Sequence, residues 1–145
     1  MKYSNKELSL IGSSLYLCEG ARARVSKRSN GQKQNIFAIE FTNMDTRVIK
    51  LFLEFLRKVL KADENKIKAE LFIYPDHDDF KLKNYWIKQT RIPLSRFNKT
   101  IKLKQKNIKY KPNPLGILKI RYSHKEHFLK MQGIIKKIFG PEVDF

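Results

Sequence analysis

Residues 5–28, NKELSLIGSSLYLCEGARARVSKR, decide the fold, because a helical pattern passes there into a strand pattern. Residues 5–18 are rich in apolar side chains and contain no proline, so they predict a helix that is capped by Ser4 or Asn5 and stops at Gly20. Residues 21–28 alternate between small and basic side chains, which predicts a strand with one cationic face. The chain therefore begins with a helix that leads directly into a half-basic strand.

The same two periodicities continue along the chain. A turn at 29–31 predicts that strands 21–28 and 35–42 pair as a hairpin. Further strands are predicted at 66–74, 99–106 and 116–122, and further helices over about 16 residues after Asn43 or Asp45, at about 78–90 and at 124–139. The predicted order is α-β-β-α-β-α-β-β-α. We therefore expect one α+β domain over residues 1–145, with helices packed on one face of a mainly antiparallel sheet.

Charge and cysteine content narrow the function. The 145 residues include 31 Lys and Arg against 14 Asp and Glu, a net charge of +17. A protein with this net charge favours an anionic partner, and nucleic acid is a better candidate than an anionic membrane. A basic surface that contacts only solvent is the third interpretation. The single cysteine, Cys18, excludes an internal disulfide and a cysteine-based zinc site, and we expect a buried, inert thiol.

Membrane and secretory segments are not predicted. The sequence has no apolar run long enough to span a bilayer, and its first ten residues, MKYSNKELSL, do not resemble a signal peptide. We therefore expect a cytoplasmic protein without a membrane partner. No small-molecule substrate is expected either, and the sequence contains no glycine-rich phosphate loop.

Strand alternation places cations on the open face of the predicted sheet, opposite the apolar residues that the helices cover. Most aromatic residues fall at predicted core positions, so the open face lacks the rings that single-stranded nucleic acid stacks on, and duplex DNA is favoured. The residues predicted to contact DNA are Arg22, Arg24, Ser26, Arg28, Lys66, Lys68, Lys102, Lys104, Lys106 and Arg121.

One face of the first helix consists mainly of small residues. On a helical wheel, Ser9, Gly12, Ser13 and Tyr16 share this face, and Glu19 follows on the same side. Such a face permits close packing against either a second copy of the helix or another helix of the same chain. We expect a second copy, so these four residues form the predicted dimer interface. Two facing Glu19 carboxylates would repel unless a cation or a proton lay between them, and a divalent metal there would suit phosphodiester hydrolysis.

Residues 12–20, GSSLYLCEG, resemble the nine-residue motif of the LAGLIDADG homing endonucleases. The closing acid and glycine of that motif correspond to Glu19 and Gly20, whereas its opening leucine and first acid are replaced by Gly12 and Leu17. The segments at 39–57 and 74–97 also resemble members of the family that carry a single motif.

The resemblance implies a saddle-shaped antiparallel sheet on duplex DNA and a homodimer that pairs its motif helices. It also implies an endonuclease that uses Mg²⁺ or another divalent cation and cuts a palindromic or nearly palindromic site, with Glu19 and Gly20 at the metal. From its place on the basic face of the last strand, Lys119 is the predicted catalytic lysine that stabilises charge at the scissile phosphate. Two alternatives stay open: a DNA-binding regulator with the same fold and no cleavage, and an RNA-binding or splicing-assistance protein.

Overall fold

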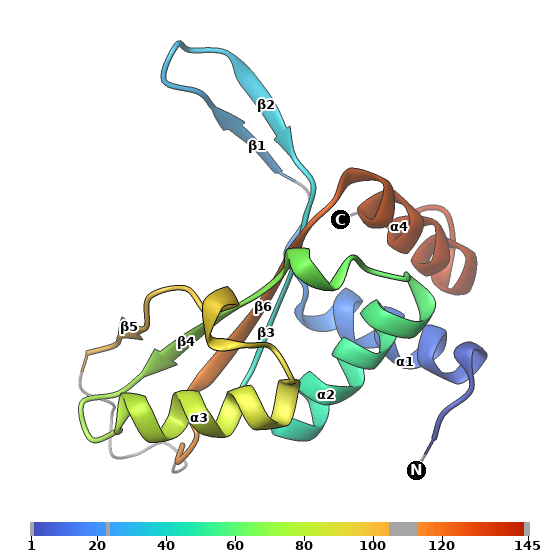
Figure 1. Ribbon diagram of the computed structural model, residues 1–145. Helices are drawn as coiled ribbons and strands as arrows, with labels where there is room; N and C mark the ends of the chain where they lie inside the picture. Colours follow the sequence, from blue (N-terminus) through green and yellow to red (C-terminus); the bar gives the residue numbers. More distant parts are fainter. Residues whose placement is uncertain (1, 23, 105–112, 144–145) are drawn as a thin grey trace.

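The computed structural model describes residues 2–22, 24–104 and 113–143 (Figure 1). The N-terminal half runs through α1 (Asn5–Glu19), β1 (Arg24–Lys27), β2 (Lys33–Ile36), β3 (Ala38–Asn43), α2 (Thr46–Glu54) and the π-helical segment η1 (Phe55–Val59). The rest runs through the 3₁₀ turn η2 (Glu64–Lys66), β4 (Ile67–Ile73), α3 (Asp79–Thr90), the 3₁₀ turn η3 (Leu94–Arg96), β5 (Ile101–Lys102), β6 (Ile117–Ser123) and α4 (Lys125–Phe139).

The main sheet has the strand order β3-β6-β4-β5. Strand β6 pairs antiparallel with both β3 and β4, and β5 pairs parallel with β4 after the crossover through α3. Every second residue of β4 is buried, as its alternating sequence predicts. The expected α+β class is confirmed, and the sheet is mixed because of β5.

The helices cover one face of this sheet. Phe41 of β3 stacks on Phe52 of α2 with ring centroids 4.3 Å apart, and Phe52 also stacks on Tyr16 of α1 at 5.8 Å. Trp86 of α3 and Phe128 of α4 are fully buried in the same apolar cluster. Burial of each large ring contributes about 2–3 kcal/mol of transfer free energy, so this face forms the core.

The hairpin of β1 and β2 forms a separate two-stranded sheet that extends away from the body (Figure 1). The predicted hairpin exists, but its second strand is divided: β2 pairs with β1, whereas β3 enters the main sheet. The expectation that strand 21–28 belongs to one continuous sheet was wrong. The physical reason lies in its apolar positions, because Ala and Val offer little area to bury, and Val25 stays 58% exposed.

Two other elements differ from their predicted lengths. The strand expected at 99–106 is limited to Ile101–Lys102; Lys104 lies beyond it, and residues 105 and 106 lie outside the described part. The helix after β3 begins behind Asp45, which caps it by accepting from the backbone N–H of Arg47. Hydrogen bonds from Arg47 hold the pKa of Asp45 at about 2. This helix is α-helical only as far as Glu54 and continues as the π-helical η1.

A pair of histidines marks the start of α4. His124 caps the helix by accepting from the N–H of His127 at 3.1 Å, and the two imidazole rings stack 3.9 Å apart. Tyr122 accepts from the N–H of Asp63 at 2.9 Å, and its hydroxyl lies 2.7 Å from Nδ1 of His127. Burial lowers the pKa of His127, and the charges of His124 and Lys130 lower it further.

In the described ranges, no helix combines the length and apolar character required to cross a bilayer.

Candidate nucleic-acid interface

The side of the main sheet opposite the core carries a set of polar residues that we call the polar face: Glu40, Thr42, Lys68, Glu70, Lys119 and Arg121. Strand register brings them together, because Arg121 of β6 lies between Glu40 of β3 and Lys68 of β4. Lys119 lies in the same way between Thr42 and Glu70. Directly paired residues share a face of a sheet, so these six side chains lie together.

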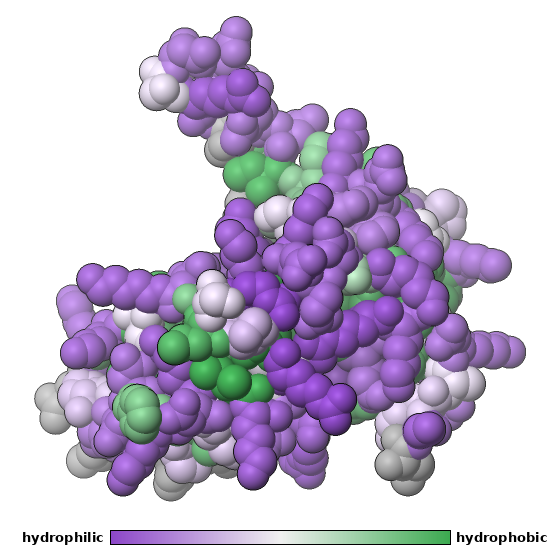
Figure 2. All heavy atoms as spheres, in the orientation of Figure 1, coloured by the Kyte–Doolittle hydropathy of each residue, from purple (hydrophilic) through white to green (hydrophobic). Residues whose placement is uncertain are grey.

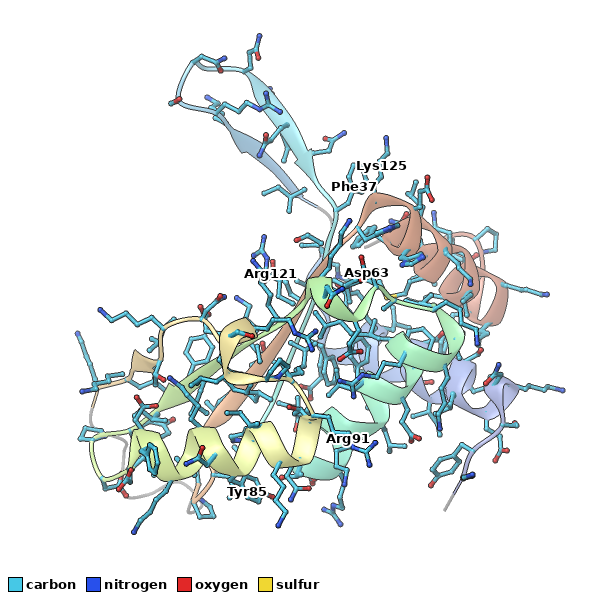
Figure 3. The ribbon with its side chains drawn as sticks, in the orientation of Figure 1. Phe37, Asp63, Tyr85, Arg91, Arg121 and Lys125 are labelled. Atoms are coloured by element: carbon cyan, nitrogen blue, oxygen red, sulfur yellow. The ribbon has the colours of Figure 1, made fainter. Side chains whose placement is uncertain are left out.

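A hollow of about 200 Å³ lies on the polar face and is lined by Lys68, Glu70, Lys119 and Arg121 together with Ala69 and Asn98. Figure 3 shows Arg121 on the side of the sheet away from α3. The side chains of Lys119 and Arg121 are 27% and 40% exposed, so their charged groups remain accessible from solvent. The polar face can therefore receive an anionic group between β4 and β6.

Glu40 organises the cations of this face. Its carboxylate is almost buried and lies 3.2 Å from Nζ of Lys119 and 3.0 Å from Nη1 of Arg121. One carboxylate therefore holds two basic side chains in fixed positions. It also offsets part of their charge, so the polar face is less strongly cationic than alternation alone predicts. Lys68 is exposed and forms no ion pair among the described residues.

Glu19 lies at the last position of α1 and is exposed. The Nδ2 of Asn43 donates to its Oε2 at 3.1 Å, which ties the carboxylate to the end of β3. The next residue, Gly20, forms a bridge with Phe41, and a Cβ at Gly20 would overlap the ring of Tyr16. Glycine is therefore needed for the close passage from helix to sheet.

Glu19 and Lys119 are both linked to the last residues of β3, but the described coordinates show no contact between them. Asn43, which holds Glu19, is adjacent in sequence to Thr42, which pairs with Lys119. The nearest acidic partner of Lys119 is Glu40 rather than Glu19. Adjacent residues of a strand point to opposite faces, so the register of β3 does not place the Glu19 carboxylate beside Lys119.

A magnesium ion would find only part of its ligand set in one copy of the chain. Among the residues that the structure describes, no three His, Cys, Asp or Glu side chains gather into a metal site. The predicted position offers one carboxylate, Glu19, and the backbone oxygen of Gly20. A hard divalent cation requires about six oxygen ligands, so most of them would have to come from a second copy, a phosphate or water.

The predicted dimer face of α1 was wrong for three of its four residues. A Cβ at Gly12 would overlap the ring of Phe55, and Ser13 is fully buried. Tyr16 is 2% exposed and donates its hydroxyl to the carbonyl of Ala21 at 2.6 Å. Ser9 alone is partly exposed. The small residues permit close packing within the chain, where α1 contacts α2, η1 and α4 (Figure 1).

The outward face of α1 consists instead of Leu10, Ser14 and Cys18, spaced four residues apart. Leu10 is 46% exposed, and Ser14 donates its hydroxyl to the carbonyl of Leu10 at 2.7 Å, which satisfies that polar group within the helix. Cys18 is exposed, so the expectation of a buried thiol was wrong. This face escaped sequence reasoning because both faces of the helix contain small and apolar residues.

The predicted DNA contacts divide between the two sheets. The backbone of Arg24 and Ser26 lies in β1, whereas Arg22 and Arg28 are exposed beside it, with Arg28 donating to Gln34 at 2.6 Å. Residues 20–39 contain five Lys and Arg and no acid, and Figure 2 shows the hairpin as largely hydrophilic. Lys27 and Lys33 of the hairpin are exposed cations outside the set of predicted DNA contacts.

The other predicted contacts are scattered. Lys66 lies in η2 before the strand begins, and Lys102 lies in β5 with Lys104 just beyond it. All three side chains are exposed. Lys106 lies outside the described residues. Of the predicted DNA contacts that the structure describes, only Lys68 and Arg121 lie together on one surface of the main sheet, beside Lys119.

No family model, no curated protein and no solved structure matches this chain.

Proposed function

We propose that this chain binds duplex DNA through the polar face and the basic hairpin, and that it acts as a homodimeric, site-specific endonuclease of the LAGLIDADG homing type. The observation that carries the proposal is the register of β3, β6 and β4, which gathers Lys68, Lys119 and Arg121 around one hollow. The hairpin adds cations without an acid between residues 20 and 39. Phosphate groups are the partners that such surfaces neutralise.

Cleavage is assigned to Glu19. A divalent cation bound there would supply a Lewis acid and a more acidic water for phosphodiester hydrolysis. The contribution of the chain is to fix the Glu19 carboxylate through Asn43 and to hold Lys119 through Glu40. Lys119 would stabilise negative charge on a phosphate that enters the hollow.

Dimer formation is assigned to the outward face of α1, Leu10, Ser14 and Cys18, in place of the face that the core uses. Pairing this face with its copy would bring two Glu19 carboxylates toward each other at the ends of two helices. A two-fold protein of this kind would read a palindromic or nearly palindromic site.

The test separates binding from cleavage. Purified wild type and Glu19→Gln are incubated with a random duplex pool in magnesium, and binding is measured in calcium. We expect Glu19→Gln to bind like the wild type and to lose cleavage at least about 100-fold, because the amide keeps the contact with Asn43 but not the charge. Glu7→Gln is the matched control, since Glu7 lies exposed at the other end of α1.

A second function, a non-cleaving DNA-binding regulator, is favoured by Leu17, which stands where the LAGLIDADG motif has its first acid. Binding to the pool without cleavage by the wild type would support it. Preference for structured RNA over duplex at equal salt would instead support the RNA-binding alternative.

A further inference from the structure

A second cationic hollow lies in the helical layer, on the opposite side of the sheet from the polar face. We call it the helical cleft. It has a volume of about 490 Å³ and lies between α2, η1 and the C-terminal end of α3. Figure 3 shows Arg91 where α3 ends beside α2. The charged side chains that line the cleft are Lys50, Glu54, Arg57, Lys58, Lys88 and Arg91.

Ion pairs with acidic residues neutralise only some of these basic side chains. Lys58 pairs with Glu54 at 2.7 Å, and Arg57 donates to both oxygens of Glu64 at 2.9 and 2.7 Å. No ion pair to Lys50, Lys88 or Arg91 occurs among the described residues, and Lys50 only reaches the amide oxygen of Gln89, at 3.4 Å. These cations converge on one hollow and raise its electrostatic potential, which an anion would lower.

Two unusual backbone segments border the cleft. Arg57 and Lys58 lie on η1, a π-helical segment of a kind that occurs frequently at functional sites. Arg91 ends α3 in the left-handed conformation with φ of 60°, where glycine is the ordinary residue. An arginine at such a position costs stability that glycine would not. The dipole of α3 explains cations near its end, but it does not explain Lys50 on the opposite wall.

We propose that the helical cleft binds a run of phosphate groups. Arg91 presents a planar fork of donors suited to phosphate oxygens, and Lys50 and Lys88 act as point charges on either side. Leu53 is the one apolar residue among the described lining, it is almost fully buried, and no aromatic ring accompanies it. A base or sugar would therefore find nothing to pack against, so the phosphate groups themselves are recognised.

The chain contains a matched control for Arg91. Lys61 is also an exposed cation in the left-handed conformation, with φ of 56°, but it does not line the cleft. Arg91→Gly and Lys61→Gly each remove one positive charge and each place glycine where glycine fits best. Both variants should therefore fold and melt at or above the temperature of the wild type.

Binding of sodium tripolyphosphate to the full chain is followed by amide NMR at 0.15 M salt. We expect shifts at amides around residues 50, 58 and 88–91, and a loss of affinity of about fivefold in Arg91→Gly but not in Lys61→Gly. Equal losses in both variants, or an absence of shifts around the cleft, would overturn the proposal. This result does not depend on whether the polar face binds DNA.

A second arm identifies the source of the phosphates. If duplex DNA displaces tripolyphosphate from the cleft and Arg91→Gly weakens duplex binding, the phosphates belong to a nucleic-acid backbone. If duplex DNA binds without disturbing the cleft amides, the ligand is a free oligophosphate. Both outcomes support a phosphate site.

Discussion

Replacing Glu40 by glutamine should change stability and DNA affinity in opposite directions. The carboxylate lies 3.2 Å from Lys119 and 3.0 Å from Arg121, so each contact carries a Coulomb attraction of about 5 kcal/mol at an effective dielectric of about 20. Desolvation of the nearly buried carboxylate offsets much of that attraction, and the amide oxygen still accepts one hydrogen bond. We therefore expect Glu40→Gln to lose about 1–2 kcal/mol of unfolding free energy.

The same substitution should strengthen binding to duplex DNA. A unit charge about 8 Å from a phosphate contributes about 1 kcal/mol at an effective dielectric of about 40, between the protein and bulk-water limits. Removal of the negative charge should therefore raise affinity about fivefold at low salt. Urea unfolding gives the first quantity, and fluorescence anisotropy with a labelled duplex gives the second.

Glu64→Gln is the control for this pair of measurements. Glu64 also bonds to arginine side chains, Arg57 and Arg96, but it lies in η2 and not on the polar face. Because Glu64 is 43% exposed and Glu40 only 7%, Glu64→Gln should lose less stability, and it should bring no gain in duplex affinity through the polar face. If Glu40→Gln bound no more tightly than the wild type, or if Glu64→Gln gained equally, the polar face would not be where DNA binds.

Two further predictions concern the fold itself. Gly12→Ala should cost about 1–3 kcal/mol in urea unfolding, because its Cβ would overlap the ring of Phe55; an unchanged midpoint would show that α1 does not pack this closely. The lowered pKa of His127 means that the unfolded chain binds more protons, so thermal stability should fall as pH drops below about 6.5. His127→Gln should flatten that part of the melting profile, and an identical slope in both proteins would contradict the assignment.

Local patterns predicted the elements of the body well. The alternation at 116–122 gives β6, and the amphipathic stripe after Asp45 gives α2 and η1. Alternation does not specify which strands pair with each other. The alternation at 21–28 predicts a strand, yet its described part, β1, pairs with β2 outside the main sheet, and Val25 stays 58% exposed.

The candidate site shows the same division. The sequence predicted Lys119 and Arg121 on one face of a strand, and register places them with Lys68. The ion pairs to Glu40 depend on which strand lies beside β6, which no local pattern specifies. The dimer face predicted on α1 was wrong for a related reason, because Gly12 makes room for the ring of Phe55 in the same chain rather than for a second copy of the helix.

The salt dependence of duplex binding tests the central claim most directly. If Lys68, Lys119, Arg121 and the basic hairpin neutralise several phosphates, log Kd plotted against log salt from 50 to 300 mM should be linear with a slope of about 4 or more. Triple substitution of Lys68, Lys119 and Arg121 by glutamine should reduce that slope by about 2–3. Duplex binding that barely responds to salt, or a slope that the triple variant leaves unchanged, would contradict the account.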